Sequence, residues 1–316
     1  MGSLSSSLRV SPSLSSVSPA LLAAEQNETV LFRASHDRSA FSFHHTLHRR
    51  FADAFSLKFL REAAERISRV NGHAYVESGT PEPAAKWGSA PGAAKPASLG
   101  DAIDGIADNS FWVVLTRLNL DPMYTPVMHQ VLDELSLLVG YPVLSRYYDP
   151  ILTALVTSPN RVTPCHVDYD TNLLLQIQGP KEISIFDGND TDIFPETARE
   201  RFWNGDTQAF AWRPELQNRA LRVSLVPGLA VHVPAACPHW LQNGPEVSIS
   251  VSVNIKRRVN IIADTYKLNA RLRRAGFSPS APGKSLAHDR AMSLAWRGAS
   301  GLAHLLHPLH LRRTTA

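Results

Sequence analysis

The chain has 316 residues, of which 44% are hydrophobic and 19% charged, the composition of a globular protein with one large domain or two ordinary ones. No apolar run approaches the roughly 18 residues that a membrane-spanning helix needs, so we expect no membrane span. The net charge of +4 is unevenly distributed, because residues 256–316 contain 12 Lys and Arg and only two acidic residues. We interpret this basic segment as a solvated helix face, and we expect no nucleic-acid partner.

The first 28 residues are rich in Ser, Leu and Ala without periodicity, which predicts a disordered tail. Ordered structure is expected from about Glu28 onward. The expected elements up to residue 140 are a helix over 52–70 with apolar residues at helical spacing, a short strand over 73–76, a loop or lid over 78–100, a β-rich run over 111–118, and a helix over 122–139 with Gly140 as its C-cap.

After Pro142 the sequence changes to short β-rich runs separated by turn residues, with no helical pattern between them. These runs cover residues 151–157, 173–177, 182–186, 221–226, 229–233 and 247–255. Several short strands of this kind predict a mainly β fold, either a sandwich or a barrel. Two helices are expected to follow, over 261–275 and 285–306.

The strongest chemical signal is the triplet His166-Val167-Asp168 together with His239, which lies 73 residues after His166. Residues i and i+2 of a strand face the same side, so His166 and Asp168 can point together into a barrel interior. Two imidazoles and one carboxylate on one face of an ion leave coordination positions open, an arrangement typical of non-haem Fe(II) oxygenases. A structural zinc site would usually close with a fourth protein ligand, often Cys.

Lys181 follows His166 by 15 residues and lies at the start of the next β-rich run. A lysine that points into an apolar barrel is costly unless it meets an anion, and a bound dicarboxylate would supply one. The hydroxyl of Thr163 and the amides of Asn172 and Asn254 could complete the hydrogen bonding of such a co-substrate. Taken alone, Lys181 could equally be a solvated turn residue, and the combination with the other positions argues against that interpretation.

The stretch 162–181, VTPCHVDYDTNLLLQIQGPK, closely resembles the jumonji-C hydroxylases, which are cupin-like Fe(II)- and 2-oxoglutarate-dependent oxygenases. The match includes the threonine three residues before His166 and the run Gln-Ile-x-Gly-x-Lys that ends at Lys181. The nearest likeness within the family is to the asparaginyl hydroxylase that inhibits hypoxia-inducible factor. The resemblance is specific over about 110 residues, from Tyr147 to Lys256.

The second half of this region also resembles the family. Pro227-Gly228, then Pro234 and then His239 follow the family's strand pair, and Asn254 falls where the asparaginyl hydroxylase has an asparagine. Two departures concern the substrate side: Leu229 replaces the acid that commonly follows Pro-Gly, and Cys237-Pro238 replaces an aromatic pair before the last histidine.

The resemblance implies a double-stranded β-helix, or jelly roll, with flanking N- and C-terminal helices. It implies Fe(II), 2-oxoglutarate and O₂ as cofactor and co-substrates. The implied roles are iron binding by His166, Asp168 and His239, pairing of Lys181 with the distal carboxylate of 2-oxoglutarate with help from Thr163, and lining of the pocket by Asn172 and Asn254.

The expected organisation is a tail over 1–28, an oxygenase domain over 29–256 with its catalytic core at about 142–256, and a basic helical extension over 257–316. By analogy with the related hydroxylase, this extension is a possible dimerisation element, and we expect a homodimer. The two cysteines, Cys165 and Cys237, are too few for a disulfide framework, which favours a cytoplasmic protein.

Three functions are compatible with this constellation. The first is hydroxylation of a protein or peptide side chain with release of succinate and CO₂. The second is the same chemistry on a small molecule in a biosynthetic pathway, because the same triad serves both. The third is a non-catalytic cupin that binds a regulatory ligand. The intact triad and Lys181 favour an enzyme over a non-catalytic cupin. Of the two possible reactions, we expect hydroxylation and not demethylation.

Other histidines are expected to be structural. His232 lies in the β-rich run before His239, and we interpret it as a packed strand residue and not as the ligand. His44, His45 and His48 could suggest a second metal site, but a surface cluster near the N-terminus is the simpler interpretation.

Overall fold

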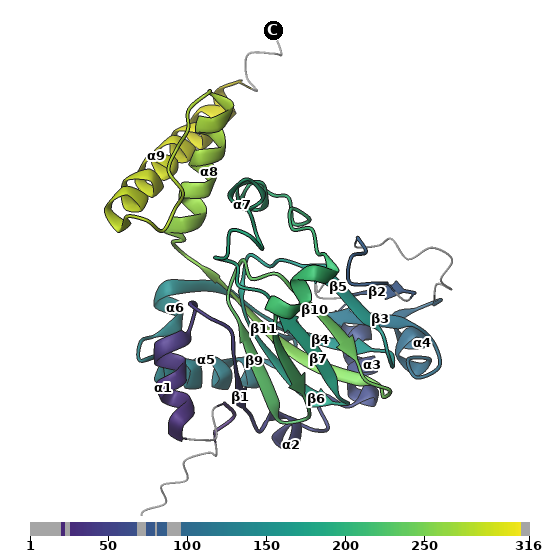
Figure 1. Ribbon diagram of the computed structural model, residues 1–316. Coiled ribbons are helices and arrows are strands. Elements are labelled where there is room, and N and C mark those ends of the chain that lie inside the picture. Colours follow the sequence, from purple (N-terminus) through teal and green to yellow (C-terminus); the bar gives the residue numbers. More distant parts are fainter. Residues whose placement is uncertain (1–19, 23–25, 68–73, 80, 87–95, 311–316) are drawn as a thin grey trace, which may run out of the picture.

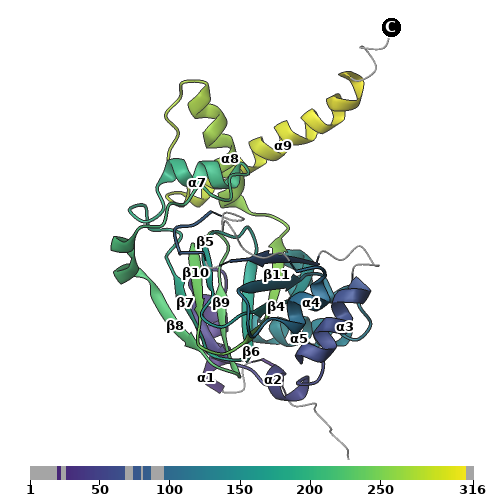
Figure 2. The ribbon, with the colours of Figure 1, turned by 90° about the vertical axis from the view of Figure 1, so that its right-hand side faces the viewer.

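A computed structural model of the chain describes residues 20–22, 26–67, 74–79, 81–86 and 96–310, with side chains up to residue 300. Its centre is a sandwich of two antiparallel sheets, with helices on one outer face and a helical pair that projects from one end (Figures 1 and 2). The prediction of a mainly β fold with flanking helices is therefore confirmed. The finer assignment to a double-stranded β-helix stays a prediction with which this sandwich is consistent.

The larger sheet has seven strands in the order β1-β9-β6-β11-β4-β3-β2. Its strands are β1 (Phe41–His44), β2 (Ala74–Ser78), β3 (Phe111–Leu115), β4 (Tyr147–Thr157), β6 (Thr171–Gln178), β9 (Leu229–Val233) and β11 (Ser248–Arg257). The smaller sheet has the order β5-β10-β7-β8. Its strands are β5 (Val162–His166), β7 (Lys181–Ile185), β8 (Leu221–Leu225) and β10 (His239–Asn243).

Strand β6 shows how the sequence divides the two faces of the larger sheet. Leu173 and Leu175 pack into the core shared with the helices, whereas Leu174 packs with Ile183 and Ile185 of the smaller sheet. Since successive side chains of a strand point to opposite faces, Asn172 falls on the inner face together with Leu174. A polar position on the inner face of a sandwich is the first structural sign of a site there.

Helices from the first half of the chain cover the outer face of the larger sheet (Figure 2). They are α1 (Gln26–Ser35), α2 (Leu47–Arg50), α3 (Leu57–Ile67), α4 (Leu99–Asp104), α5 (Thr125–Val139) and α6 (Val143–Arg146), with the short 3₁₀ turn η1 (Leu118–Leu120). Helix α5 ends as predicted, because Gly140 adopts a left-handed φ of 79° and its amide bonds to the carbonyl of Ser136.

The C-terminal helix α8 (Ile261–Arg274) lies against α9 (Leu286–His310) and against α7 (Glu196–Trp203). The remaining element is the 3₁₀ helix η2 (Pro214–Arg219). Asn260 caps α8 by accepting a hydrogen bond from the amide of Ala263. Asp264 joins the two helices, since it accepts from Ser293 at 2.7 Å and pairs with Arg297 at 2.7 Å. Dimerisation through these helices stays a prediction.

Several boundaries differ from those expected. Helix α3 begins at Leu57 and not at residue 52, because the Ser56 hydroxyl accepts from the amide of Phe59 in the manner of an N-cap. The tail was expected to be disordered to residue 28, yet Leu21 and Leu22 are buried and their amides donate to Glu134. Residues 1–19, and residues 87–95 of the expected lid, lie outside the described residues. No helix in the described ranges has the length and apolarity to cross a bilayer.

Candidate functional site

His166, Asp168 and His239 come together at one end of the smaller sheet. His166 ends β5 and His239 begins β10, and the two residues are direct partners in the antiparallel pairing of these strands. A carboxylate oxygen of Asp168 lies 4.0 Å from Nε2 of His166 and 3.8 Å from Nε2 of His239. The potential ligand atoms of the three residues all lie within 4.8 Å of one another. This spacing would let one ion reach all three side chains with small rotations.

Backbone carbonyls orient both imidazoles. Nδ1 of His166 lies 2.8 Å from the carbonyl oxygen of Pro164, and Nδ1 of His239 lies 3.0 Å from that of Cys237. A carbonyl can only accept, so each Nδ1 carries the proton and each Nε2 carries a lone pair directed at the shared centre. Burial, followed by the nearby His166, lowers the pKa of His239 to about 4, which keeps this ring in the neutral form that binds metals.

The three residues lie at the end of a cavity of about 280 Å³ between the two sheets. Residues from both sheets form its walls. All seven residues selected from the sequence line it: Thr163, His166, Asp168, Asn172, Lys181, His239 and Asn254. The structure thus brings together side chains that are up to 91 positions apart in the sequence.

Lys181 is buried in this cavity, with 5% of its surface exposed, and is not a solvated turn residue. Nζ donates to Oγ of Ser250 at 2.9 Å, and Ser250 donates in turn to Gln176 at 2.7 Å. Within the described ranges no carboxylate lies at ion-pair distance from Nζ, and burial lowers the pKa of Lys181 to about 7. An ammonium buried without a counter-charge is unfavourable, so the cavity is built to receive an anion at this end.

The remaining polar residues lie between Lys181 and the triad. Thr163 and Asn172 are buried, and the hydroxyl of Ser252 lies 3.0 Å from Oδ1 of Asn172 and 2.6 Å from Oδ1 of Asn254. A residue not selected from the sequence, Ser252, therefore links the two amides. These groups give the cavity wall hydrogen-bonding capacity along the path from the ammonium to the three ligands.

The donor set fits a metal that keeps open positions. Neither cysteine offers a thiolate: burial raises the pKa of Cys237 to about 11 and raises the pKa of Cys165 strongly as well. Among the residues that the structure describes, the group contains the two histidines and the aspartate and no fourth His, Cys, Asp or Glu. Three ligands without a closing thiolate match the Fe(II) facial arrangement better than a structural zinc site.

The mouth of the cavity contains aromatic residues that the sequence did not reveal. Tyr75 of β2 and Trp112 of β3 line it, with ring centroids 6.1 Å apart, together with Val114 and Thr116. Burial, then the charges of Glu77 and Asp168, raises the pKa of Tyr75 to about 12. The alternation of Trp112, Val114 and Thr116 in a β-rich run was a signal for a shared face, but the sequence alone did not show that this face borders the site.

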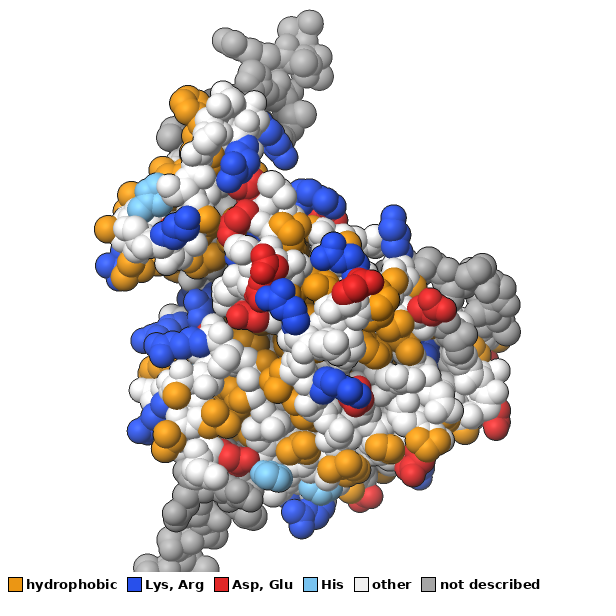
Figure 3. Space-filling model, in the orientation of Figure 1, with side chains coloured by type: hydrophobic (Ala, Val, Ile, Leu, Met, Phe, Trp, Pro, Cys, Tyr) orange, Lys and Arg blue, Asp and Glu red, His pale blue; other side chains and the backbone are white. Residues whose placement is uncertain are grey.

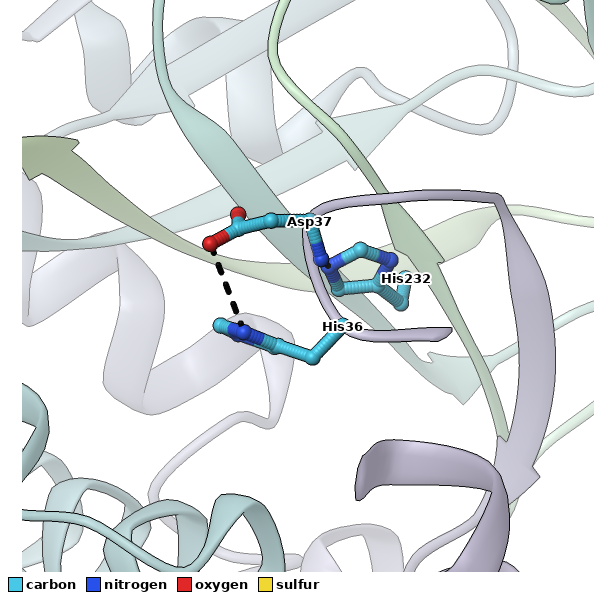
Figure 4. A group of neighbouring side chains, drawn as sticks. All are labelled: His36, Asp37 and His232. Carbon is cyan, nitrogen blue, oxygen red and sulfur yellow. Dashed lines mark hydrogen bonds and ion pairs between the residues drawn. The ribbon is translucent and has the colours of Figure 1, made fainter. Parts of the chain in front are cut away.

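A second group of the same composition lies elsewhere: His36, Asp37 and His232 (Figure 4). Nδ1 of His36 lies 3.5 Å from a carboxylate oxygen of Asp37. The same carboxylate pairs with Arg257 at 2.7 Å and accepts from the hydroxyl of Thr171. Because a guanidinium already neutralises the only anionic donor, this group is a poor cation site. His232 is fully buried and stacks on Phe41, as expected for a packed strand residue.

The expectation of a surface cluster at His44, His45 and His48 is wrong for His45. This residue is buried, and Nε2 lies 3.0 Å from the carbonyl oxygen of Gln176. Burial lowers the pKa of His45 to about 4, so its ring is neutral and packs under the larger sheet. No metal group in the described ranges includes it.

A scan against protein-family models and a search of curated proteins found no match. Among solved structures, the chain is similar to the ribosomal oxygenase YcfD of Escherichia coli. The structure with cobalt and succinic acid is 13% identical with a TM-score of 0.46, and the match covers 88% of this chain and 66% of that chain. The structure with cobalt and 2-oxoglutarate is 14% identical with a TM-score of 0.47, and the match covers 84% of this chain and 65% of that chain. The chain thus spans about two thirds of their length.

The solved structures named above are ribosomal oxygenases, and the finer resemblance to the asparaginyl hydroxylase stays a prediction from the sequence.

Proposed function

We propose that the chain is an Fe(II)- and 2-oxoglutarate-dependent oxygenase. One observation carries this proposal: a cavity that has a His-Asp-His group with oriented Nε2 atoms at one end has a buried lysine without a counter-charge further inside. A ligand that chelates a metal at one end and carries a carboxylate at the other would satisfy both features, and 2-oxoglutarate is such a ligand.

In this proposal His166, Asp168 and His239 hold the iron, and the carbonyls of Pro164 and Cys237 keep the two rings in their binding tautomer. Lys181 pairs with the distal carboxylate, and Thr163, Asn172 and Asn254 bind along the co-substrate. When bound, iron and 2-oxoglutarate supply the activation of O₂ for oxidation of a C–H bond, with succinate and CO₂ as products. The protein positions the reactants and excludes water from the cavity.

We favour a protein or peptide side chain as the substrate over a small metabolite. At about 280 Å³ the cavity lies near the lower end of the range for small-molecule pockets, about 300–1,000 Å³, and it must also hold the co-substrate. The remaining space suits one side chain that enters at the aromatic mouth formed by Tyr75 and Trp112. Hydroxylation of a small molecule is the second candidate, since it uses the same ligands.

The test is a measurement of succinate formed from 2-oxoglutarate by the full chain with Fe(II), O₂ and a library of peptides and metabolites. We expect turnover for the wild type and background levels for His166→Ala and Asp168→Ala. Binding is measured separately without O₂, as the heat of 2-oxoglutarate titration in the presence of Mn(II).

The two measurements separate the three functions. Turnover with a peptide supports the first, and turnover only with a metabolite supports the second. Metal-dependent 2-oxoglutarate binding without turnover on any substrate identifies a ligand-binding regulator. Absence of metal binding at the triad would contradict the proposal as a whole. A matched control is His232→Ala, which removes a buried histidine from a strand adjacent to the site-bearing strand β6 without touching the triad.

A further inference from the structure

A second cleft lies beside α1, apart from the cavity that contains the triad. Its volume is about 520 Å³, and the two cavities share no lining residue. Three segments that are far apart in the sequence form it, namely residues 32–38, 139–147 and 257–261. We call it the basic cleft, because five arginines line it: Arg33, Arg38, Arg146, Arg257 and Arg258.

Positive charge dominates the basic cleft. Asp37 is the one carboxylate among the lining residues, and it already pairs with Arg257 at 2.7 Å. The neighbouring His36 adds no charge, because burial lowers the pKa of its ring. Within the described ranges no Asp or Glu pairs with any of the other four arginines. Four guanidinium groups therefore remain without a counter-charge in this part of the chain.

Aromatic rings and backbone carbonyls, and not carboxylates, hold these arginines. The guanidinium carbon of Arg146 lies 3.9 Å from the ring centroid of Tyr141, and Nε of Arg258 lies 3.2 Å from the carbonyl oxygen of Leu144. Each guanidinium has five N–H donors, so such contacts leave most of the donors unused. All five arginines are exposed to solvent, and the remaining donors are therefore accessible to a ligand.

The deeper wall of the basic cleft is apolar. Phe32, Val139 and Tyr147 line it and are buried, and Tyr141 and Ile261 line it and are half-buried. A ligand in the cleft would thus meet exposed cations together with an apolar surface. Burial of an organic group against that surface would add to the attraction between opposite charges.

The size of the basic cleft suits one small molecule. Ligand pockets commonly have volumes of about 300–1,000 Å³, and this cleft lies inside that range. A nucleic-acid strand needs a basic groove that follows its backbone over several nucleotides. The five arginines instead line a single hollow, and Figure 3 shows basic side chains gathered over α1 and α6, just below the helical extension. A compact anion therefore fits better than a strand.

We propose that the basic cleft binds a small organic molecule with two phosphate groups, such as a nucleoside diphosphate. Guanidinium groups match phosphate oxygens in two-point hydrogen bonds. One phosphate group carries only about −1.5 to −2 charges at neutral pH, so two are needed to balance four guanidinium groups. The apolar wall receives the organic part. This site does not depend on the proposed oxygenase activity.

The experiment is a calorimetric titration of the metal-free full chain with adenosine diphosphate (ADP) and, separately, with inorganic pyrophosphate, at constant ionic strength. We expect saturable ADP binding that is at least about fivefold tighter than pyrophosphate binding, because the nucleoside buries apolar surface that pyrophosphate lacks. The double variant Arg33→Gln and Arg146→Gln is expected to bind ADP at least about tenfold more weakly, since two charged donors are lost. Both side chains are exposed, so the variant is expected to fold.

Two control variants accompany this titration. Arg222→Gln removes an exposed arginine of β8 that pairs with Glu182, outside the lining of the cleft, and should leave the ADP affinity unchanged. Lys181→Met should also leave it unchanged, which separates this site from the proposed co-substrate pocket. Tighter binding of an RNA oligonucleotide than of ADP would identify a nucleic-acid surface and overturn the proposal. Unsaturable ADP binding, equal affinity for ADP and pyrophosphate, or full ADP affinity in the double variant would also overturn it.

Discussion

The described part of the chain contains two groups of two histidines and one aspartate, one at the inner face of the larger sheet and one at its outer face. His166, Asp168 and His239 lie at the inner cavity between the two sheets, whereas His232 belongs to the outer, helix-covered side together with His36 and Asp37. In the inner group, carbonyls orient both imidazoles and no Lys or Arg of the described ranges pairs with the carboxylate. In the outer group, Arg257 and Thr171 occupy the carboxylate.

The difference shows that residue types alone do not make a metal site. A ligand set needs lone pairs that converge, a carboxylate that is not already neutralised, and room for the ion and its other ligands. The inner group meets these conditions, and the outer group uses the same side chains to fasten α1 to the larger sheet.

The largest expected difference is in metal affinity. His239→Ala removes one ligand from the inner group, and we expect Mn(II) or Fe(II) to bind at least about 100-fold more weakly, because loss of a ligand should exceed the 10–100-fold cost of losing an outer-shell partner. His232→Ala should leave the metal affinity within a few fold and instead destabilise the fold by about 2 kcal/mol. Anaerobic calorimetric titration measures the first effect and urea unfolding the second. A metal site in the outer group would show the reverse pattern.

Lys181→Met should lower the affinity for 2-oxoglutarate while raising the stability of the metal-free protein. We expect 2-oxoglutarate affinity to fall by more than about 30-fold, because the distal carboxylate would be buried without its cation. The metal-free protein should become more stable by about 2 kcal/mol at neutral pH. The pKa of Lys181 is lowered from 10.5 to about 7, so the wild type loses stability as pH falls through that window, and Met removes this loss.

The control for this variant is Lys256→Met. Lys256 is partly exposed and pairs with Asp149 at 2.9 Å, outside the residues that line the cavity. Unchanged 2-oxoglutarate affinity is expected there. Equal losses in both lysine variants would mean that overall charge, and not the buried ammonium, attracts the co-substrate.

Gly188→Ala tests whether the loop 234–237 positions the ligands of the inner group. A Cβ at this position would lie 2.1 Å from the carbonyl oxygen of Ala236, a backbone atom that cannot move without displacing the loop 234–237. We expect a loss of about 1–3 kcal/mol in stability and a roughly tenfold loss in metal affinity. Gly298→Ala on α9 has nothing within 4 Å of its Cβ and should be neutral or slightly stabilising. Intact metal affinity in Gly188→Ala would show that the loop does not position the ligands.

The inner group could be predicted from the sequence because its signals are local. Strand periodicity placed His166 and Asp168 together by their spacing, although β5 ends at His166 and Asp168 lies two residues beyond the strand. Lys181 was placed with them because it begins a β-rich run, which the structure shows as β7. The family motif selected His239, and not His232, as the second histidine ligand. The structure supplies the physical reason, because His232 pairs with Leu173 and faces the helix-covered side of the larger sheet.

The outer group and the burial of Arg199 could not be predicted in this way. His36 and Asp37 follow α1, which the sequence did not reveal, and they meet His232 only through tertiary packing. Arg199 lies on α7, a short helix without strong periodicity, and its burial depends on α8 and the loop 234–237. A charged residue in a polar segment is normally exposed to solvent, and no local sequence pattern indicates that Arg199 is buried.

The last expected effect is a change in the pH dependence of stability, which shows only below about pH 6.5 and arises outside the inner cavity. Burial, followed by the nearby His36, lowers the pKa of His232 to about 3, although Asp37 opposes this shift. Burial and then His48 lower the pKa of His45 to about 4. Both rings therefore stay neutral in the folded protein at pH values where the unfolded chain, with an ordinary histidine pKa near 6.5, binds protons.

Because the unfolded state binds more protons, the free energy of unfolding must fall as pH decreases from about 6.5 toward 4, by up to about 1.4 kcal/mol per pH unit for each histidine. His232→Phe keeps the aromatic contact with Phe41 and should flatten this slope by about one proton, even if its stability at pH 7.5 is lower. Urea unfolding at pH 7.5, 6.0, 5.0 and 4.5 measures the slope. An unchanged slope in His232→Phe would mean that His232 takes up a proton in the folded protein, and the outer group would then be a charged site and not a neutral packing element.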